Sequence, residues 1–267
     1  MLDQAQPTKA PFDLHAAEPI PAAVRDEIEW LLSSGDLFRY TSQNAPVTLL
    51  EREFAAQLGS TYALAVSSCS AALFLSLKAL DVPRDARVLI PAFTFAAVPS
   101  SVVHAGCVPV LCEVGENYRI DLNDFAGKLE QDISAVIISH MRGHTSDMDA
   151  IMRLCDARNI PVIEDAAHSL GTTWHGKNIG TLGQIGCFSF TDDADLVARA
   201  TIMSGAYEHA WEKHDIAAEA VEKWQNKLPL YNLRLSNMSA AIVRAQLPEI
   251  ARRVADGRRN HDRLAAQ

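Results

Sequence analysis

The sequence lacks several features that mark specialised classes of protein. Its 267 residues contain no uninterrupted apolar run of the roughly 18 residues that a membrane-spanning helix needs. The N-terminus has no basic start followed by an apolar stretch, so we expect no secretory signal. The five cysteines form no CxxC pair, which favours reduced thiols in the cytoplasm over disulfides or a zinc site. The net charge of −9 argues against a general binder of nucleic acid or anionic membranes.

Well-known catalytic motifs are missing as well. The sequence contains no GxxxxGK[ST], HExxH or GxSxG motif. Gly180, Gly183 and Gly186 recur every third residue, but they do not link a strand to a helix as a Rossmann fingerprint does. His140 and His144 are the only histidines at helix-turn spacing, and they follow a predicted strand and flank a glycine. We therefore expect a loop there and no metal site.

What is present has the composition of a globular protein with a sizeable core, 48% hydrophobic and 21% charged. From about residue 62, short apolar runs alternate with amphipathic helical stretches. The runs lack polar alternation and predict central parallel strands at 63–66, 88–90, 108–112, 135–139 and 160–164. The stretches between them predict helices at 70–80, 95–104, 122–129 and 148–157. This spacing predicts a doubly wound α/β fold, with a mainly parallel sheet and helices on both faces.

Three segments are expected along the chain. Residues 1–60 form a helical arm, with helices at 21–32 and 47–58 joined by a turn-rich loop. Residues 61–235 form the large α/β domain. Residues 236–267 are helical, carry six arginines and are interrupted at Pro248. We interpret the arginines as a solvated or inter-subunit face rather than as a nucleic-acid patch.

Four segments each follow a predicted strand, and together they carry the chemistry. The carboxyl ends of parallel strands meet at one edge of a sheet, so the four segments would converge on one crevice. The first is SSCSAA at 67–72, where small hydroxyl residues leave backbone N–H groups and a helix N-terminus open to a phosphate. The alternative is that Ser70 only caps the helix. The second, PAFTF at 91–95, places Phe95 either on a planar heterocycle or in the core.

The third and fourth segments add a carboxylate and another hydroxyl. IEDAAH at 163–168 ends a buried strand with Asp165, and a buried carboxylate needs a partner. A protonated pyridine nitrogen would suit, because Asp165 would then keep that ring an electron sink. A salt bridge or a helix cap is the alternative, and His168 by itself is most simply a structural histidine. In GCFSF at 186–190, Ser189 is placed to add a second hydroxyl to a phosphate.

In this order the segments resemble the sugar aminotransferases that depend on pyridoxal 5'-phosphate (PLP), members of the aspartate aminotransferase superfamily with fold type I. The resemblance runs from residue 34 to 267 and is most specific in SSCSAALFLSLKAL, in VLIPAFTFAAVPSSVVHAGCVPVLCEV and in the segment 147–190. It implies that PLP is the cofactor. It also implies a set of phosphate-binding residues, the last of them reaching over from a partner chain: Ser68, Cys69, Ser70, Ser189 and Asn232.

The resemblance also implies roles around the cofactor ring. Phe95 would stack on the ring, Asp165 would pair with its nitrogen, and His168 would lie near its 3-oxygen. The implied activity is transfer of an amino group from glutamate or glutamine to a keto-sugar attached to a nucleotide. The implied assembly is a homodimer, because Asn232 would act in the partner's site.

The sequence departs from the family at the residue that carries the chemistry. In the family a lysine follows the FSF segment and forms a Schiff base with PLP, whereas here Phe190 is followed by TDDADL. Counted without a gap, the lysine position falls on Ala194. A gapped comparison fits better and leaves out the lysine, its glycine-rich loop and a β-strand. No histidine stands at the lysine position after FSF either. The other lysines considered fall in a predicted hairpin (Lys177) or in the later helical region (Lys213, Lys223 and Lys227), so we assign no catalytic residue.

Two interpretations of this departure stay open. Residues 236–267 resemble the helix that leads into the family's C-terminal small domain, and the 267 residues contain no such domain. Either they belong to a longer, conventional aminotransferase whose lysine loop and small domain are not represented, or the chain is a shortened paralogue without a Schiff-base lysine. For the paralogue we expect negligible transaminase turnover.

Overall fold

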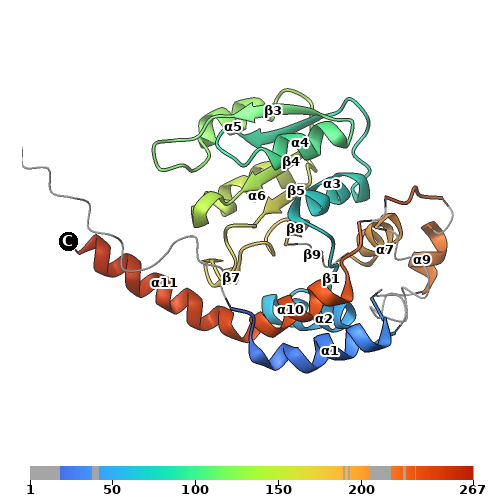
Figure 1. The fold of residues 1–267 in the computed structure, drawn as a ribbon. Helices are drawn as coiled ribbons and strands as arrows, with labels where there is room; N and C mark the ends of the chain where they lie inside the picture. The colour runs from blue at the N-terminus through green and yellow to red at the C-terminus, as the bar shows by residue number, and fades with distance from the viewer. Residues whose placement is uncertain are drawn as a thin grey trace, which may run out of the picture.

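The computed structural model describes residues 19–37, 42–188, 190–191, 193–204, 218–224, 227–231 and 233–266. Its central sheet has seven strands in the order β1-β9-β8-β5-β4-β2-β3 (Figure 1). Strands β2, β3, β4, β5 and β8 pair in parallel, and β9 runs antiparallel to β8 and β1. The predicted α/β fold with a mainly parallel sheet is confirmed. The strands are β1 (Tyr62–Ala63), β2 (Arg87–Pro91), β3 (Val108–Cys112), β4 (Ile133–Ser139), β5 (Val162–Asp165), β8 (Ile185–Cys187) and β9 (Phe190–Thr191).

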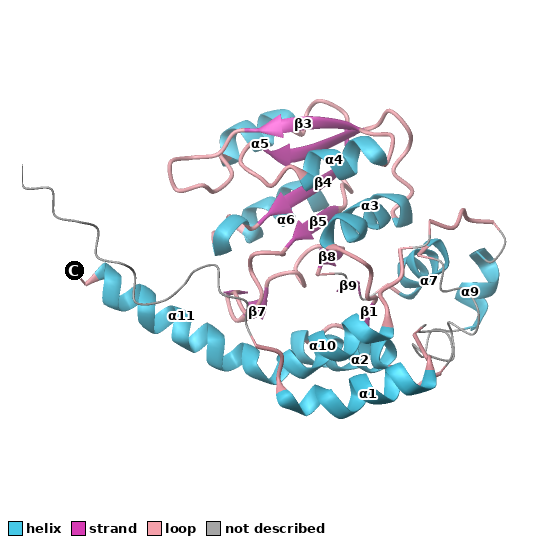
Figure 2. Cartoon of the chain, viewed as in Figure 1, coloured by secondary structure: helices cyan, strands magenta, loops and turns pink. Residues whose placement is uncertain are grey.

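Helices cover both faces of the sheet, as Figure 2 shows. On one face, Leu73 packs in a cluster with Val88; on the other, Phe125 packs in a cluster with Leu89. Val88 and Leu89 are neighbours on β2, so the alternation of side chains along one strand builds both hydrophobic layers. The helices that flank the sheet are α3 (Cys69–Ala79), α4 (Ala97–His104), α5 (Leu122–Lys128), α6 (Met148–Asp156) and α7 (Ala194–Met203).

Short polar residues begin several of these helices. Ser68 caps α3, Asp121 caps α5 and Asp147 caps α6, in each case through a side-chain oxygen that accepts a backbone N–H of the first turn. A carboxylate at this position also complements the positive end of the helix dipole. These caps fix where each helix starts after the preceding strand or loop.

The N-terminal helices and α10 pack together at one end of the sheet (Figure 1). Val47 packs with Ala240, and Leu31 packs with Ala241. A short 3-10 helix, η4, contains Pro248 and separates α10 from α11, so the predicted interruption is confirmed. Helix α11 extends away from this cluster and has no buried residue. The elements are η1 (Ala22–Val24), α1 (Arg25–Ser34), α2 (Pro46–Leu58), α10 (Asn237–Gln246), η4 (Leu247–Glu249) and α11 (Ile250–Ala265).

Three local features refine the sequence prediction. Strand β9 begins three residues after β8 ends and pairs with it antiparallel. A short strand is therefore present close to the place where the gapped comparison with the family leaves a strand out. Helix α4 begins at Ala97, two residues later than predicted, because Phe95 belongs to the preceding loop. The hairpin predicted around Lys177 is confirmed as β6 (Thr173–Trp174) and β7 (Lys177–Asn178), with positive φ at both turn residues.

The remaining described elements are short. They are η3 (Met141–Gly143), between β4 and α6, and α9 (Ala218–Trp224), which packs against α7. Across the described ranges, no helix combines the length and the apolar character that crossing a membrane requires.

Candidate cofactor site

Strand β5 ends in two neighbouring carboxylates, Glu164 and Asp165. Successive side chains of a strand point to opposite faces of the sheet, so the two carboxylates face different surroundings. Both are buried, with 0% of Glu164 and 8% of Asp165 exposed. Pairing with β4 places Ile138 beside Glu164 and Ser139 beside Asp165. Because a buried carboxylate is costly unless it is bonded, the partners of each one decide what it does.

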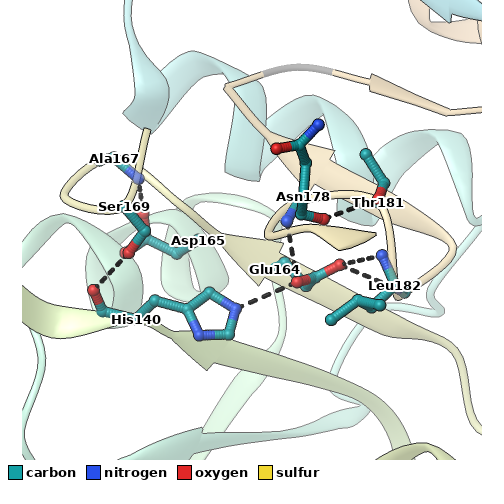
Figure 3. A network of polar contacts seen from close by, with 10 residues as sticks. His140, Glu164, Asp165, Ala167, Ser169, Asn178, Thr181 and Leu182 are labelled. Carbon is teal, nitrogen blue, oxygen red and sulfur yellow. Dashed lines mark hydrogen bonds and ion pairs between the residues drawn. The ribbon is translucent and has the colours of Figure 1, made fainter. Parts of the chain in front are cut away.

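Four hydrogen bonds surround Glu164 (Figure 3). Its Oε2 accepts from His140 Nε2 at 3.1 Å and from the Gly180 N–H at 3.0 Å, and its Oε1 accepts from the N–H groups of Leu182 and Gly183 at 2.7 Å each. An ionised carboxylate only accepts, so His140 Nε2 carries the proton of their bond. Burial raises the pKa of Glu164, but His140 and the backbone donors outweigh it and hold the pKa below its usual value. Glu164 is thus a saturated, structural carboxylate.

The glycines of GTLGQIG make this arrangement possible. A Cβ at Gly183 would lie 2.6 Å from the Val162 carbonyl oxygen, and one at Gly186 would lie 2.0 Å from the Gly180 carbonyl oxygen. Only glycine permits approaches this close between backbone segments. The recurring glycines therefore let a loop close around Glu164 and turn its N–H groups inward.

Asp165 faces the other side of β5 and receives three neutral donors. Its Oδ2 accepts from Ser139 Oγ at 3.0 Å, and its Oδ1 accepts from the Ala167 N–H at 3.3 Å and from Cys69 Sγ at 3.6 Å. Burial, with the nearby charge of Asp165 and the hydrogen bond to it, raises the pKa of the Cys69 thiol to about 12, so the thiol stays protonated. Its single proton is shared between Asp165 Oδ1 and the carbonyl oxygen of Cys187, which lies 3.3 Å from Sγ. Among the described residues, no lysine, arginine or histidine nitrogen pairs with Asp165. This carboxylate is bonded and buried, yet none of the described residues gives it a cationic partner.

The N-terminus of α3 lies beside Asp165, because Cys69, which contacts Asp165, is the first residue of the helix. Ser68, and not Ser70, caps the helix: Ser68 Oγ accepts from the Ala71 N–H at 3.1 Å, so the proposed cap by Ser70 is wrong. The bond leaves the hydroxyl proton of Ser68 available. The N–H groups of Cys69 and Ser70 have no partner in the described part of the chain, and both serines are exposed. Two open N–H groups and two hydroxyls at the positive end of a helix suit an anion such as phosphate.

Phe95 lies in the loop between β2 and α4. Its side chain is 63% exposed, so the alternative that it belongs to the core is wrong. The preceding residue, Thr94, ties this loop to Asp165, because Thr94 Oγ1 lies 2.6 Å from Ser139 Oγ and Ser139 in turn donates to Asp165. The structure thus brings together the start of α3, the loop after β2 and the end of β5. It also brings the described part of the fourth segment there, because Cys187 of β8 pairs with Asp165 and its carbonyl oxygen lies 3.3 Å from Cys69 Sγ.

The structure gives less information on the remaining predicted residues, His168, Ser189 and Asn232. His168 lies exposed in the turn after β5, and it has no hydrogen bond or ion pair with any residue that the structure describes. Ser189 and Asn232 lie outside the described residues. Leu233, next to Asn232, accepts the Ser67 N–H at 3.0 Å through its carbonyl oxygen.

Lysines that the structure describes are engaged or placed elsewhere. Lys78 Nζ donates to the Ala105 carbonyl at 2.7 Å, and Lys78 lies nine residues beyond Cys69 on α3, roughly 13 Å along the helix axis. Lys223 pairs with Asp195 at 2.9 Å. Lys177 is part of the β6–β7 hairpin, and Lys213 lies outside the described residues. The prediction that Lys227 lies in a helix is wrong, because Lys227 lies in the turn after α9.

Sequence reasoning selected Asp165 but missed the residues that organise it. Glu164 and His140 carried a usable signal, because two consecutive carboxylates on a buried strand both need partners and a histidine follows the neighbouring strand. Ser139 and Thr94 carried none. Their hydroxyls become significant only when the register of β4 and β5 and the loop after β2 bring them to Asp165.

Taken together, the geometry defines a class of α/β protein with an anion-binding helix end and an acidic residue at the carboxyl edge of a parallel sheet. Residues 20–267 match the model of the DegT/DnrJ/EryC1/StrS aminotransferase family. The chain belongs to this family, and the resemblance drawn from its motifs is confirmed.

Individual relatives cover most of the chain. It is 31% identical over 255 residues to the spore coat polysaccharide biosynthesis protein SpsC of Bacillus subtilis, covering 86% of this chain and 63% of that protein. It is 30% identical over 242 residues to the GDP-perosamine synthase of Vibrio cholerae, covering 86% and 64%. The crystal structure of an aminotransferase from Psychrobacter cryohalolentis is similar with a TM-score of 0.76 and 28% identity, covering 88% and 64%. The chain thus spans less than two thirds of the length of each of these proteins.

Proposed function

We propose that this chain forms the cofactor-binding part of a PLP-dependent sugar aminotransferase. The observation that carries the proposal is that Asp165, a buried carboxylate with no cation among the described residues, lies beside the open N-terminus of α3. The two fit opposite ends of one ligand. A protonated pyridine nitrogen supplies the missing cation, and a phosphate accepts the N–H groups of Cys69 and Ser70.

The residues present suit the cofactor by the chemistry of their donors. Bound PLP supplies an electron sink for chemistry at the α-carbon of an amino acid. Asp165 holds the proton on the ring nitrogen, and the hydroxyls of Ser68 and Ser70 donate to the phosphate. Phe95 would stack on the ring, and His168 would lie near its 3-oxygen. Ser189 and Asn232 complete the phosphate site in this proposal.

The reaction that we propose is transfer of an amino group from glutamate or glutamine to a nucleotide-linked keto-sugar. Family membership and the similarity to a GDP-perosamine synthase support it. We further propose a cytoplasmic homodimer in which Asn232 serves the partner's site, and a division into an arm (1–60), an α/β domain (61–235) and a helical segment (236–267). A monomeric mass in light scattering, at protein concentrations used for binding, would contradict the dimer.

A second candidate is a non-catalytic paralogue that binds PLP without a covalent link and serves in assembly. One specific observation favours it: the sequence contains no lysine between Lys177 and Lys213, so none comes shortly after the FSF segment. In this case the pocket around Asp165 binds cofactor, but no amine of the protein takes part in proton transfer.

Titration of the purified protein with PLP separates these candidates. For the enzyme we expect a visible absorbance band that borohydride bleaches into a covalent adduct, together with glutamate-dependent amination of a nucleotide-linked keto-sugar. For the paralogue we expect saturable PLP binding that dialysis removes, with no adduct and no turnover. A wild-type protein that shows no saturable PLP binding, either by absorbance or by equilibrium dialysis, would contradict both candidates.

A further inference from the structure

A short chain of hydroxyl groups ends on the carboxylate of Asp165. Thr94 Oγ1 lies 2.6 Å from Ser139 Oγ, and Ser139 Oγ lies 3.0 Å from Asp165 Oδ2. Ser139 is buried, with 8% of its surface exposed. Its contact with Asp165 follows from the parallel register of β4 and β5, which sets the two residues side by side.

The direction of the protons in this chain follows from the donor inventory of each group. A carboxylate oxygen only accepts, so the single hydroxyl proton of Ser139 points at Asp165. Ser139 then has only lone pairs left for Thr94, and Thr94 must donate to Ser139. Both hydroxyl protons are therefore aligned toward the carboxylate, and the outer bond fixes the rotamer of the inner hydroxyl.

The other oxygen of Asp165 is held as well. Oδ1 accepts the Ala167 N–H at 3.3 Å and the Cys69 thiol at 3.6 Å. With Oδ2 bonded to Ser139, the carboxylate plane is restrained from both sides. A restrained carboxylate loses less rotational freedom when a ligand binds, and such preorganisation strengthens binding.

We infer that Ser139 and Thr94 are positioning residues, which orient the Asp165 carboxylate toward the ring nitrogen of the cofactor. The inference rests on the proposed function and adds to it two residues that do not touch the cofactor themselves. Their effect reaches the ligand only through the bond between Asp165 and the ring nitrogen. It should therefore disappear with a ligand that lacks this nitrogen.

The experiment compares two ligands on four proteins. The ligands are PLP and an analogue in which C–H replaces the ring nitrogen, and equilibrium dialysis gives their dissociation constants. The proteins are the wild type, Ser139→Ala, Thr94→Val and a control, Ser146→Ala. Ser146 is also buried, at 3% exposed, and its hydroxyl accepts the Ile120 N–H at 3.0 Å, but it makes no hydrogen bond to Asp165. Thr94→Val keeps the shape of the side chain and removes only the outer hydroxyl.

The expected result is selective for the ligand. Ser139→Ala should weaken PLP binding about tenfold and Thr94→Val about threefold, as expected for losing a direct and an indirect hydrogen bond to a charged group. Both variants should bind the analogue like the wild type, and Ser146→Ala should change neither constant.

Two different results would overturn the inference. Variants at 139 and 94 that bind PLP like the wild type, or that lose affinity for both ligands equally, would show that the hydroxyls do not act through Asp165. A wild type that binds neither ligand would instead contradict the proposed function. If Ser139→Ala does not fold, Thr94→Val alone still decides, because its ligand selectivity is the measured quantity.

Discussion

Glu164 and Asp165 are adjacent carboxylates on one strand, yet the fold gives them different surroundings. Glu164 receives a histidine and three backbone N–H groups, which occupy both oxygens. Asp165 receives a hydroxyl, a thiol and one N–H group, and it opens toward the N-terminus of α3. The comparison separates two uses of a buried acid. One is saturated inside the protein and stabilises a loop, whereas the other leaves a cationic partner to be supplied by a ligand.

We expect the greatest change when the saturated carboxylate, Glu164, is removed. Glu164→Ala should lower the free energy of unfolding by about 3–5 kcal/mol, because it leaves His140 and three inward-facing N–H groups buried without a partner. Urea denaturation followed by circular dichroism measures this. The control is Glu116→Ala at an exposed position, which should stay within about 0.5 kcal/mol of the wild type. Equal stabilities for the two variants would remove the structural role of Glu164.

Replacement of the other carboxylate, Asp165, should weaken cofactor binding and leave the fold intact. Asp165→Asn should weaken PLP binding by about 2 kcal/mol, roughly 30-fold, because the amide cannot pair as an anion with a protonated ring nitrogen. Its unfolding free energy should change by less than about 1 kcal/mol, since the amide oxygen still accepts a bond. Asp149→Asn, at an exposed position, is the matched control. A variant that unfolds easily but binds PLP normally would reverse the comparison.

Protonation of Glu164 at low pH should lower the stability of the folded protein. The pKa of Glu164 in the folded protein is held below its usual value by His140 and the backbone donors, against the opposing effect of burial. Its stabilising contribution is therefore complete above the unfolded pKa of about 4.3 and is lost as the pH falls through the folded pKa. The urea midpoint measured between about pH 7 and pH 3 should fall more steeply for the wild type than for Glu164→Gln, which does not titrate. Parallel curves for the two proteins would contradict this account.

Removal of the Phe95 ring should have a smaller effect on PLP binding than replacement of Asp165. Phe95→Ala should weaken PLP binding by about 1 kcal/mol, as expected for the loss of one aromatic contact, without lowering the unfolding free energy. Trp30→Ala removes an aromatic ring of similar exposure on α1, 51% against 63% for Phe95, and should leave PLP binding unchanged. If both variants bind PLP equally well, Phe95 does not contact the cofactor ring.

Much of the fold was predictable because it depends on local pattern. Strands β2, β3, β4 and β5 were predicted as apolar runs, β3 with its observed bounds. The prediction of a central parallel strand at 63–66 is wrong, because β1 is a two-residue edge strand antiparallel to β9, and the parallel strand β8 was not predicted. The break at Pro248 followed from the missing N–H and fixed φ of proline. The shortest strands were not predictable. Two residues of β9 have no period to detect, and their pairing with β1 and β8 depends on segments distant in sequence.

Some features of the candidate site were likewise predictable from the sequence, and others were not. Motifs, hydrophobic period and chain order are local properties, so they were enough to identify the family, the α/β class and the positions of Asp165, Cys69 and Phe95 after predicted strands. The packing of the chain was needed to show which carboxylate is saturated, that Ser68 rather than Ser70 caps α3, and that Thr94 and Ser139 lead to Asp165. Those outcomes depend on the register between strands and on glycines that let backbones approach, and both arise only when distant segments pack together.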